Sequence, residues 1–369
     1  MSIGKRPCPH CGGQMHRGST QCLSCAKGQV VAVHSVPVER TVEDDRKQRQ
    51  SASELSSLKR RYAEALRTIE QQEHDLRAVN VLGQGLETYT IQPTVGHGTS
   101  EGTVVMVASD WHLEEVVGAE VGGLNIFNAD IAKARVDKFF QAGLRLIQLL
   151  QQDITINTLI LALLGDFISN DIHEEFADTA SLQPMHALAL VQSYLVSGIE
   201  FLLQNTSLVL VVPCHSGNHA RTTKTTRFSA ENGHSLEYLL YLHLAAYFRN
   251  EPRVTFIIPE GMHSYMDIYG TVVRFQHGHA IKYGGGVGGI YIPVNKAIAQ
   301  WDRARKADFN IFGHFHQLVD GGNFVANGSL IGYNAFALSI KASYEKPKQA
   351  LMLFDRKRGR TCLWPIFLD

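Results

Sequence analysis

The chain has 369 residues, enough for one large catalytic domain and a smaller appendage. Its 35 Lys and Arg balance its 35 Asp and Glu, so no overall field draws it to nucleic acid or to a membrane, and any such attraction must be local. No apolar run approaches the roughly 18 residues of a membrane helix, and the N-terminus lacks an apolar signal region. We therefore expect a cytoplasmic protein that does not engage a membrane.

Four of the six cysteines lie near the N-terminus, in two Cys-x-x-Cys pairs. Four thiolates at this spacing typically bind one structural Zn²⁺, and disulfides are the less favoured alternative in a reducing cytosol. Residues 1–30 cannot build an apolar core, so zinc would supply most of the folding energy of this zinc-ribbon-like module. The module is mildly basic and suits contact with nucleic acid or with a protein. The predicted zinc ligands are Cys8, Cys11, Cys22 and Cys25.

Residues 31–50 are polar and charged and predict a linker, and residues 83–102 predict a second one. Between them, residues 51–82 carry apolar side chains at alternating spacings of three and four, the pattern of an amphipathic helix or a short coiled coil. If this helix associates with a second copy, the protein is a homodimer through residues 51–82. Otherwise the stripe packs on the main domain. The stripe consists of Leu55, Leu58, Tyr62, Ala65, Ile69, Leu76 and Val79.

Apolar, β-branched runs and helical patterns follow from residue 103 onwards and predict an α/β domain over residues 103–369. We expect two layers of sheet with helices outside them. The predicted strands are 103–108, 156–164, 207–212, 254–258, 271–276, 308–312, 350–354 and 361–366. The predicted helices are 128–152, 180–204, 233–249 and 290–306.

Five of these strands are followed by polar side chains that can bind a metal. In α/β folds the loops after the strands meet at one edge of the sheet, where such folds place their sites. A single motif would be weak evidence, because a lone buried histidine is usually a core residue, but five in one order indicate a common site. The motifs are Asp110-Trp111-His112, Gly165-Asp166, Gly217-Asn218-His219, His277-Gly278-His279 and Gly313-His314-Phe315-His316.

In this order the motifs match the signature DxH, GD, GNH, H and GHxH, so residues 103–330 resemble the calcineurin-like metallophosphoesterases. The resemblance implies a two-sheet α/β sandwich that holds two divalent metals. Mixed oxygen and nitrogen ligands suit manganese, which we expect, and also iron, zinc or cobalt. The resemblance further implies that one metal is bound by Asp110, His112 and His316, the other by Asn218, His277 and His314, and that Asp166 bridges both.

Two such metals can deprotonate a bridging water and hold both oxygens of an in-line displacement at phosphorus. His219, which lies beside a ligand, can then act as the general acid that protonates the leaving oxygen. Many members of the family have an acidic residue after this histidine, whereas this chain has Ala220, so another group must hold His219. The arginine that marks protein phosphatases after the GD motif is absent, which counts against that activity.

Three cations, Arg221, Lys224 and Arg227, follow the third motif and are interleaved with threonines. Such a run is commonly a solvated face, but Arg suits bidentate phosphate contact, so the loop can hold phosphates beyond the scissile one. His279 can contact phosphate or support a ligand. The glycine-rich stretch 284–289 lacks the lysine of a phosphate-binding loop and predicts a flexible lip of the same cleft.

These features favour a phosphodiesterase that acts on nucleic acid, similar to the double-strand-break-repair nucleases of the superfamily. The stretches GNHARTTK and GHFHQ also resemble phage-encoded phosphoesterases, which would place the protein in a bacterial or phage-infected cytoplasm. A small-molecule phosphatase or cyclic-nucleotide phosphodiesterase on the same scaffold is the alternative. A catalytically inactive adaptor is disfavoured because the ligand motifs are intact.

Overall fold

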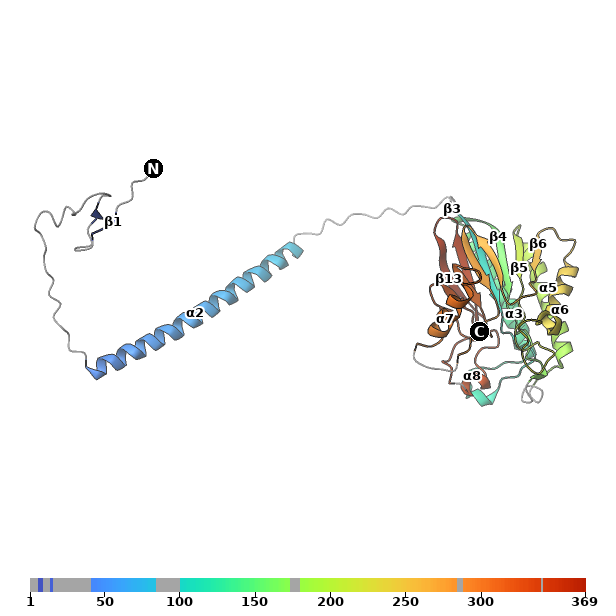
Figure 1. Ribbon diagram of the computed structural model, residues 1–369, viewed down its shortest axis with the longest axis horizontal. Helices are drawn as coiled ribbons and strands as arrows, with labels where there is room; N and C mark the ends of the chain where they lie inside the picture. The colour runs from blue at the N-terminus through green and yellow to red at the C-terminus, as the bar shows by residue number, and fades with distance from the viewer. Residues whose placement is uncertain are drawn as a thin grey trace, which may run out of the picture. The chain divides into compact units, whose positions relative to one another are not determined.

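The computed structural model in Figure 1 describes residues 6–8, 14–15, 41–83, 100–172, 180–283, 288–339 and 341–369. For residues 6, 14, 15 and 78–83 the description covers the backbone only. The chain divides into two compact units, Met1–Gln92 and Pro93–Asp369. The boundary falls within the predicted second linker.

The first unit contains a small two-stranded antiparallel sheet formed by β1 (Arg6–Pro7) and β2 (Gln14–Met15). Cys8, a predicted zinc ligand, follows β1 directly and is buried. The other predicted ligands, Cys11, Cys22 and Cys25, lie outside the described residues. The zinc-ribbon-like module over residues 1–30 therefore stays a prediction.

One long helix, α2 (Val42–Gly83), follows in the first unit. It begins before residue 51, so the assignment of residues 42–50 to a linker was wrong. The Asp44 backbone N–H donates to the Thr41 hydroxyl at 3.3 Å, and the Thr41 N–H donates to the Asp44 carboxylate at 3.2 Å. This reciprocal cap satisfies two free donors, and acidic residues in the first turn favour the positive end of the helix dipole.

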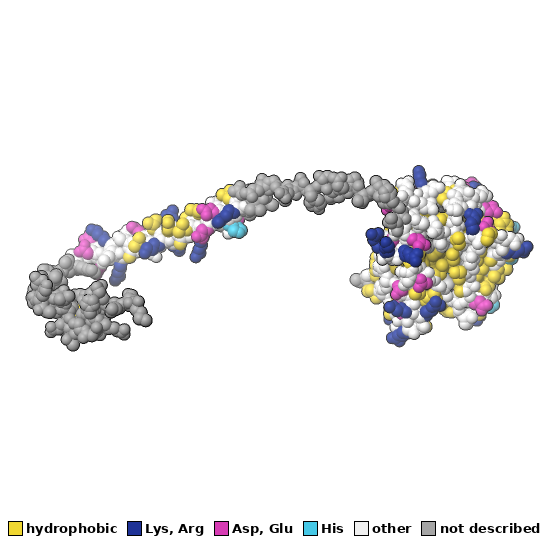
Figure 2. All heavy atoms as spheres, turned by 90° about the horizontal axis from the view of Figure 1, so that it is seen from above, with side chains coloured by type: hydrophobic (Ala, Val, Ile, Leu, Met, Phe, Trp, Pro, Cys, Tyr) yellow, Lys and Arg dark blue, Asp and Glu magenta, His cyan; other side chains and the backbone are white. Residues whose placement is uncertain are grey.

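The apolar stripe predicted on this helix is exposed in the single chain. Figure 2 shows hydrophobic side chains on the helix surface between charged ones. Exposed leucines at heptad-like spacing suit a second copy of the helix, and the homodimer stays a prediction. The exposed large side chains of the stripe are Leu55, Leu58, Tyr62, Ile69 and Leu76.

The second unit contains a six-stranded sheet of β3 (Ser100–Ala108), β4 (Ile154–Leu163), β5 (Val209–Pro213), β6 (Val254–Ile257), β12 (Lys348–Asp355) and β13 (Gly359–Phe367). The strand order is β13-β12-β3-β4-β5-β6. Strands β3 to β6 are parallel, whereas β12 and β13 are antiparallel additions at one edge. The parallel strands therefore bring the ends of β3, β4 and β5 to the same edge of the sheet.

A five-stranded sheet consists of β7 (Ser264–Ile268), β8 (Thr271–Phe275), β9 (Phe309–Phe312), β10 (Val319–Asp320) and β11 (Phe324–Ala326), in the order β10-β11-β9-β8-β7. Strands β8, β9 and β11 are parallel, and β7 and β10 pair antiparallel at the two edges. The sequence did not indicate β7, β10 or β11. Strands β10 and β11 have two and three residues, too few to show a clear hydrophobic period.

The helices cover the outer faces of the two sheets. Along β3, Val104 and Met106 belong to the core beneath the helices, whereas Val105 and Val107 face the five-stranded sheet, as the two-residue period of a strand requires. On the other side, Val294 and Ile298 pack against the five-stranded sheet. The predicted two-sheet α/β sandwich flanked by helices is confirmed. Its helices are α3 (Ala129–Leu150), α5 (Pro184–Asn205), α6 (Leu236–Tyr247), α7 (Tyr291–Trp301) and α8 (Ala335–Ser339), with 3₁₀ turns η1 (Ala119–Val121), η2 (Asn170–Ile172) and η3 (Asn232–His234).

Helix α5 is long and apolar enough to cross a membrane by length and composition, contrary to the expectation that no segment reaches this limit. One face of the helix is buried in the core beneath the six-stranded sheet. Buried side chains at Leu188, Val191, Leu195 and Ile199 follow the spacing of a core-facing helix stripe. The apolar composition of α5 is therefore explained by its place in the domain core.

Candidate metal centre

The five motifs meet where strands of both sheets end. The loops after β3 and β4 are joined by a hydrogen bond from the Asp110 N–H to the Gly165 carbonyl, at 2.9 Å. The loop after β9 joins them through the His314 N–H, which donates to the Asp110 carboxylate at 2.9 Å. The ring Nδ1 of His277, after β8, donates to the Leu164 carbonyl at 2.6 Å. Backbone and ligand side chains thus form one connected cluster.

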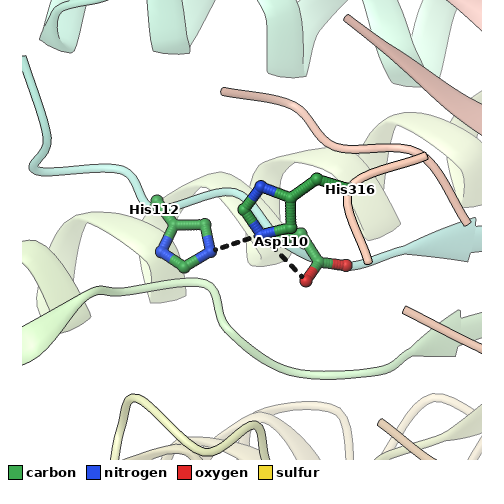
Figure 3. A group of neighbouring side chains, drawn as sticks. All are labelled: Asp110, His112 and His316. Atoms are coloured by element: carbon green, nitrogen blue, oxygen red, sulfur yellow. Dashed lines mark hydrogen bonds and ion pairs between the residues drawn. The ribbon is translucent and has the colours of Figure 1, made fainter. Parts of the chain in front are cut away.

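Asp110, His112 and His316 form the first group of candidate metal ligands, with ligand atoms all within 4.8 Å of one another. Figure 3 shows the two imidazole rings facing each other beside the carboxylate. The Nε2 atoms of His112 and His316 lie 3.1 Å apart, and His316 Nε2 lies 3.4 Å from Asp110 Oδ1. Burial lowers the pKa of His112 well below its usual value and that of His316 to about 4. Both rings are therefore neutral at pH 7, the form that binds a metal.

Asp166, His277 and His314 form the second group, again within 4.8 Å of one another. His277 Nε2 lies 2.9 Å from Asp166 Oδ2. Burial alone would favour a neutral His277, but the charge of Asp166 raises the pKa of this ring to about 10, so a metal bound at Nε2 would have to displace a proton. Burial likewise opposes the charge of Asp166, yet His277 and His219 outweigh it and hold the pKa of Asp166 well below its usual range.

Asn218 completes the predicted set of seven ligands. The side-chain Oδ1 of Asn218 is buried and has no hydrogen-bond partner among the described residues, which is costly unless a cation satisfies it. Asp166 acts electrostatically on His112 and His316 in the first group and on His277 in the second. The two groups fit a dinuclear site, and the bridging role of Asp166 stays a prediction.

Solved structures similar to this chain include an archaeal phosphodiesterase, at 12% identity and a TM-score of 0.32 over 71% of this chain and 99% of the other. A predicted phosphoesterase from Streptococcus pneumoniae TIGR4 is similar at 12% identity and a TM-score of 0.27, over 72% and 98%. A single mutant of Vps29 from Entamoeba histolytica is similar at 13% identity and a TM-score of 0.30, over 71% and 98%. No protein-family model and no curated protein matches the chain. These TM-scores are too low to carry a functional argument, which must come from the site itself.

The candidate metal centre places several ligands in a rarely occupied backbone conformation. A positive φ is unusual outside glycine and persists only where surrounding contacts impose it. In this site the loops are cross-linked by backbone hydrogen bonds, including Trp111 N–H and His112 N–H to the Asp166 carbonyl. The ligands with positive φ are Asp110 (55°), His112 (46°), Asp166 (53°), His314 (71°) and His316 (54°).

Two motif glycines are explained by close approach of the loops. A Cβ at Gly217 would overlap the Asp166 side chain, and a Cβ at Gly313 would overlap Asp110 and Ser109. A larger residue at either position would displace a candidate ligand. The glycine before each of these ligand loops is therefore part of the geometry of the metal site.

Buried carboxylates that the sequence did not indicate hold the ligand loops. Both oxygens of Glu237, in the first turn of α6, accept backbone hydrogen bonds at 2.7 Å, one from Phe167 and one from Gly217. Burial, reinforced by the charge of Asp166, raises the pKa of Glu237 to about 8. Glu237 thereby ties the Gly-Asp loop to the Gly-Asn-His loop. An acidic residue in the first turn of a helix gave no sign of this role, because that position is usually solvated.

A second buried carboxylate supports the proposed general acid. Glu114 accepts hydrogen bonds from the backbone N–H groups of Ser169 and Asn170 at 2.7 and 2.8 Å. His219 Nδ1 lies 3.2 Å from the Ser169 carbonyl, to which it can donate, and the Asn170 side chain donates to the His219 carbonyl at 3.2 Å. Ala220, where an acidic residue is common in the family, is fully buried. The segment 169–170 therefore supplies the support that position 220 lacks.

The predicted phosphate-binding residues occupy different environments. The Arg221 guanidinium donates to the carbonyls of Asn218 and Thr223, so part of its hydrogen-bonding capacity is used within its own loop. Lys224 and Arg227 are exposed. His279 stacks on Phe228, with ring centroids 5.6 Å apart, and burial lowers its pKa to about 3. Residues 284–287 of the predicted glycine-rich lip lie outside the described residues.

Proposed function

We propose that this chain is a two-metal phosphoesterase that hydrolyses phosphodiester bonds in nucleic acid, with His219 as the general acid. The observation that carries the proposal is the pair of ligand groups around Asp166, completed by the unpartnered Oδ1 of Asn218. The outer nitrogens of His112 and His277 are occupied by Ser169 Oγ and the Leu164 carbonyl, which directs each Nε2 inward.

Two divalent cations held by these groups would supply positive charge at the phosphate and a nucleophile near neutral pH. His219 contributes the proton. Its Nδ1 faces the Ser169 carbonyl, and its Nε2 lies 4.0 Å from Asp166 Oδ2, on the side of the ligands. In its protonated form, Nε2 can donate to the leaving oxygen, which is most important when that oxygen is strongly basic.

The surroundings of Asn218 support a polymeric substrate. A recess of about 10 Å³ begins at Gly217 and Asn218 and is bordered by Glu231 as well as by Thr223, Thr226 and Arg227, so further phosphates would contact its rim. A guanidinium and hydroxyl groups beside a phosphate site are suited to the phosphates that flank the scissile one. Since the chain has no net charge, binding to nucleic acid would depend on such local contacts.

The remaining assignments complete the proposal. We propose manganese for the dinuclear site, because its ligands combine carboxylate, amide and imidazole groups. One zinc bound by the four N-terminal cysteines would fold a module that contacts nucleic acid or protein. A homodimer through residues 51–82 and a bacterial or phage-infected cytoplasm remain proposed.

The test is to assay the full chain with Mn²⁺ on bis-p-nitrophenyl phosphate, p-nitrophenyl phosphate, and labelled single- and double-stranded DNA, with Asp166→Asn as the inactive control. Cleavage of the diester and of DNA is expected. Cleavage of the monoester without DNA cleavage would favour a small-molecule phosphatase. A protein that binds two metals and cleaves none of these substrates would instead be an adaptor.

A further inference from the structure

A cleft of about 660 Å³ opens beside His314 and His316 of the metal centre. Its walls are helix α8, the turn at Gly289 and Ile290, and the loop that follows β9. Pockets of roughly 300–1,000 Å³ are the usual size for binding a small organic group. Two candidate metal ligands line the cleft, so the cleft adjoins the metal centre. One substrate molecule could therefore place a phosphate at the metals and another group in the cleft.

Four aromatic residues are among those that line this cleft, namely Tyr283, Phe315, Phe336 and the buried Tyr333. Phe336 is 56% exposed and Tyr283 is 41% exposed, so both present ring surface to solvent. Phe315 lies against His314, with ring centroids 5.2 Å apart. The aromatic lining therefore extends to a candidate metal ligand.

Several polar groups of the same wall are bonded to one another. The side-chain amide of Gln317 donates to the Ser343 carbonyl at 3.2 Å. The Glu345 carboxylate accepts from the Leu318 N–H at 2.9 Å and pairs with Lys348 at 2.6 Å. Much of the polar capacity of this wall is thus already used. The cleft therefore favours stacking on aromatic rings over hydrogen bonds to the polar edge of a base.

The aromatic wall is held in a fixed relation to the metal ligands. Asn334 caps α8 by accepting from the Ala337 N–H at 3.0 Å, and its side-chain amide donates to Glu115 at 3.2 Å. The other oxygen of Glu115 accepts from the Ser169 hydroxyl, which bonds His112 Nδ1 at 2.7 Å. One hydrogen-bonded chain therefore connects α8, which carries Phe336, to a ligand of the first group.

We propose that this cleft binds the base of the nucleotide whose phosphate lies at the metal centre, by stacking and with little discrimination between bases. The proposal rests on the proposed function, since it assumes a nucleotide phosphodiester. Under this proposal the substrate extends from the metal centre in two directions. Arg227 borders the recess beside Asn218, where further phosphates would lie, whereas the ring cleft borders His314. Stacking on an aromatic side chain changes affinity by roughly 5- to 150-fold per base and tolerates any base, because every base has a π-face.

The test compares Phe336→Ala with the matched variant Leu338→Ala. Both residues are exposed on α8, but Leu338, which is 47% exposed, does not line the cleft. The substrates are the dinucleotide TpT and its analogue with abasic sugars, in full-length protein with Mn²⁺. Phe336→Ala should lower kcat/KM for TpT by about 10-fold and for the abasic analogue by less than about twofold. Leu338→Ala should change neither. An equal loss on both substrates, or no loss on TpT, would overturn the proposal.

A binding measurement separates failure of this proposal from failure of the proposed function. Saturation-transfer NMR with thymidine 5′-monophosphate should show transfer from the protein to the base protons, and Phe336→Ala should weaken it. If the wild-type protein cleaves neither dinucleotide but shows this transfer, the proposed hydrolysis fails and base binding in the cleft stands. If the wild-type protein shows no transfer to the base, the cleft proposal is wrong, whatever the activity.

Discussion

The role of His219 can be tested by changing Asn170, a residue that supports the proposed acid through backbone contacts. The Asn170 side-chain amide donates to the carbonyls of His219 and Arg221, at 3.2 and 2.9 Å. Asn170 has a φ of 55°, a conformation that glycine adopts without strain. Asn170→Gly therefore removes these two hydrogen bonds, and the one that Asn170 Oδ1 accepts from the Asp171 N–H at 2.9 Å, without forcing the backbone to move. It leaves the contact between His219 Nδ1 and the Ser169 carbonyl in place.

The expected magnitudes follow from these contacts. Each of the three lost hydrogen bonds contributes about 0.5–1.5 kcal/mol, so the free energy of unfolding should fall by about 1.5–4.5 kcal/mol. General acid catalysis is worth about 10²- to 10⁴-fold, which is the loss expected for His219→Asn with a poor leaving group. Because Asn170→Gly removes only part of the support, we expect about a 10-fold loss, equivalent to about 1.4 kcal/mol of activation free energy.

The assay is kcat/KM for aryl methyl phosphate diesters whose leaving groups range from p-nitrophenol to phenol. Both variants should lose most with phenol and little with p-nitrophenol, because only a basic leaving oxygen needs the proton. Metal content should be unchanged, since no ligand atom is altered. Asn205→Gly is the control, because it removes an exposed amide whose hydrogen bond is to Phe201 in α5. A loss of equal size for every leaving group, or a loss of metal, would refute the role assigned to Asn170.

Three further predictions concern the ligands, the loops and the substrate. Asp166→Asn should lose most of the catalytic metal measured by elemental analysis, because it removes the proposed bridging charge, and full metal content would contradict the assignment. Glu237→Ala leaves two buried N–H groups unpaired, at about 1–3 kcal/mol each, so it should lower the free energy of unfolding by about 2–6 kcal/mol. A chemical-denaturation midpoint equal to that of the wild type would exclude this role. Joint replacement of Lys224 and Arg227 by Ala should raise KM for DNA and reduce the slope of log KM against log salt by about two. Unchanged salt dependence would mean that these side chains form a solvated face.

The fold and the two candidate ligand groups could be anticipated because their signals are local. Each motif follows a strand, and parallel strands carry their following loops to one edge of a sheet, so residues far apart in the chain converge there. Gly217 and Gly313 add to this signal, since the overlap that a Cβ would cause excludes other residues. The start of α2 was also readable from Thr41 and Asp44, whose spacing is that of a capping box, but it was missed.

The supports of the ligand loops could not be anticipated, because their partners are distant in sequence. Glu237 lies 70 residues from Phe167, to which it is bonded, and Glu114 lies 55 residues from Ser169. A glutamate in a helix or loop is normally solvated, and its local sequence does not reveal that its carboxylate will accept hydrogen bonds from backbone N–H groups of distant loops. The sequence also did not predict the positive φ of Asp110, because tertiary contacts impose this conformation on a residue that is not glycine.

Arg221 was predicted to bind phosphate, but its guanidinium also donates hydrogen bonds to carbonyls of its own loop. The sequence grouped it with Lys224 and Arg227, since all three cations follow His219 within one loop. In the structure its guanidinium binds the carbonyl of Asn218, whose side chain is itself a candidate ligand. A guanidinium has five N–H donors in a rigid plane, so one arginine can fix the path of a loop through several carbonyls. Arg221 therefore has a structural reason to be an arginine, one that holds whether or not it also contacts phosphate, and Lys224 and Arg227 give the cleaner measure of binding to nucleic acid.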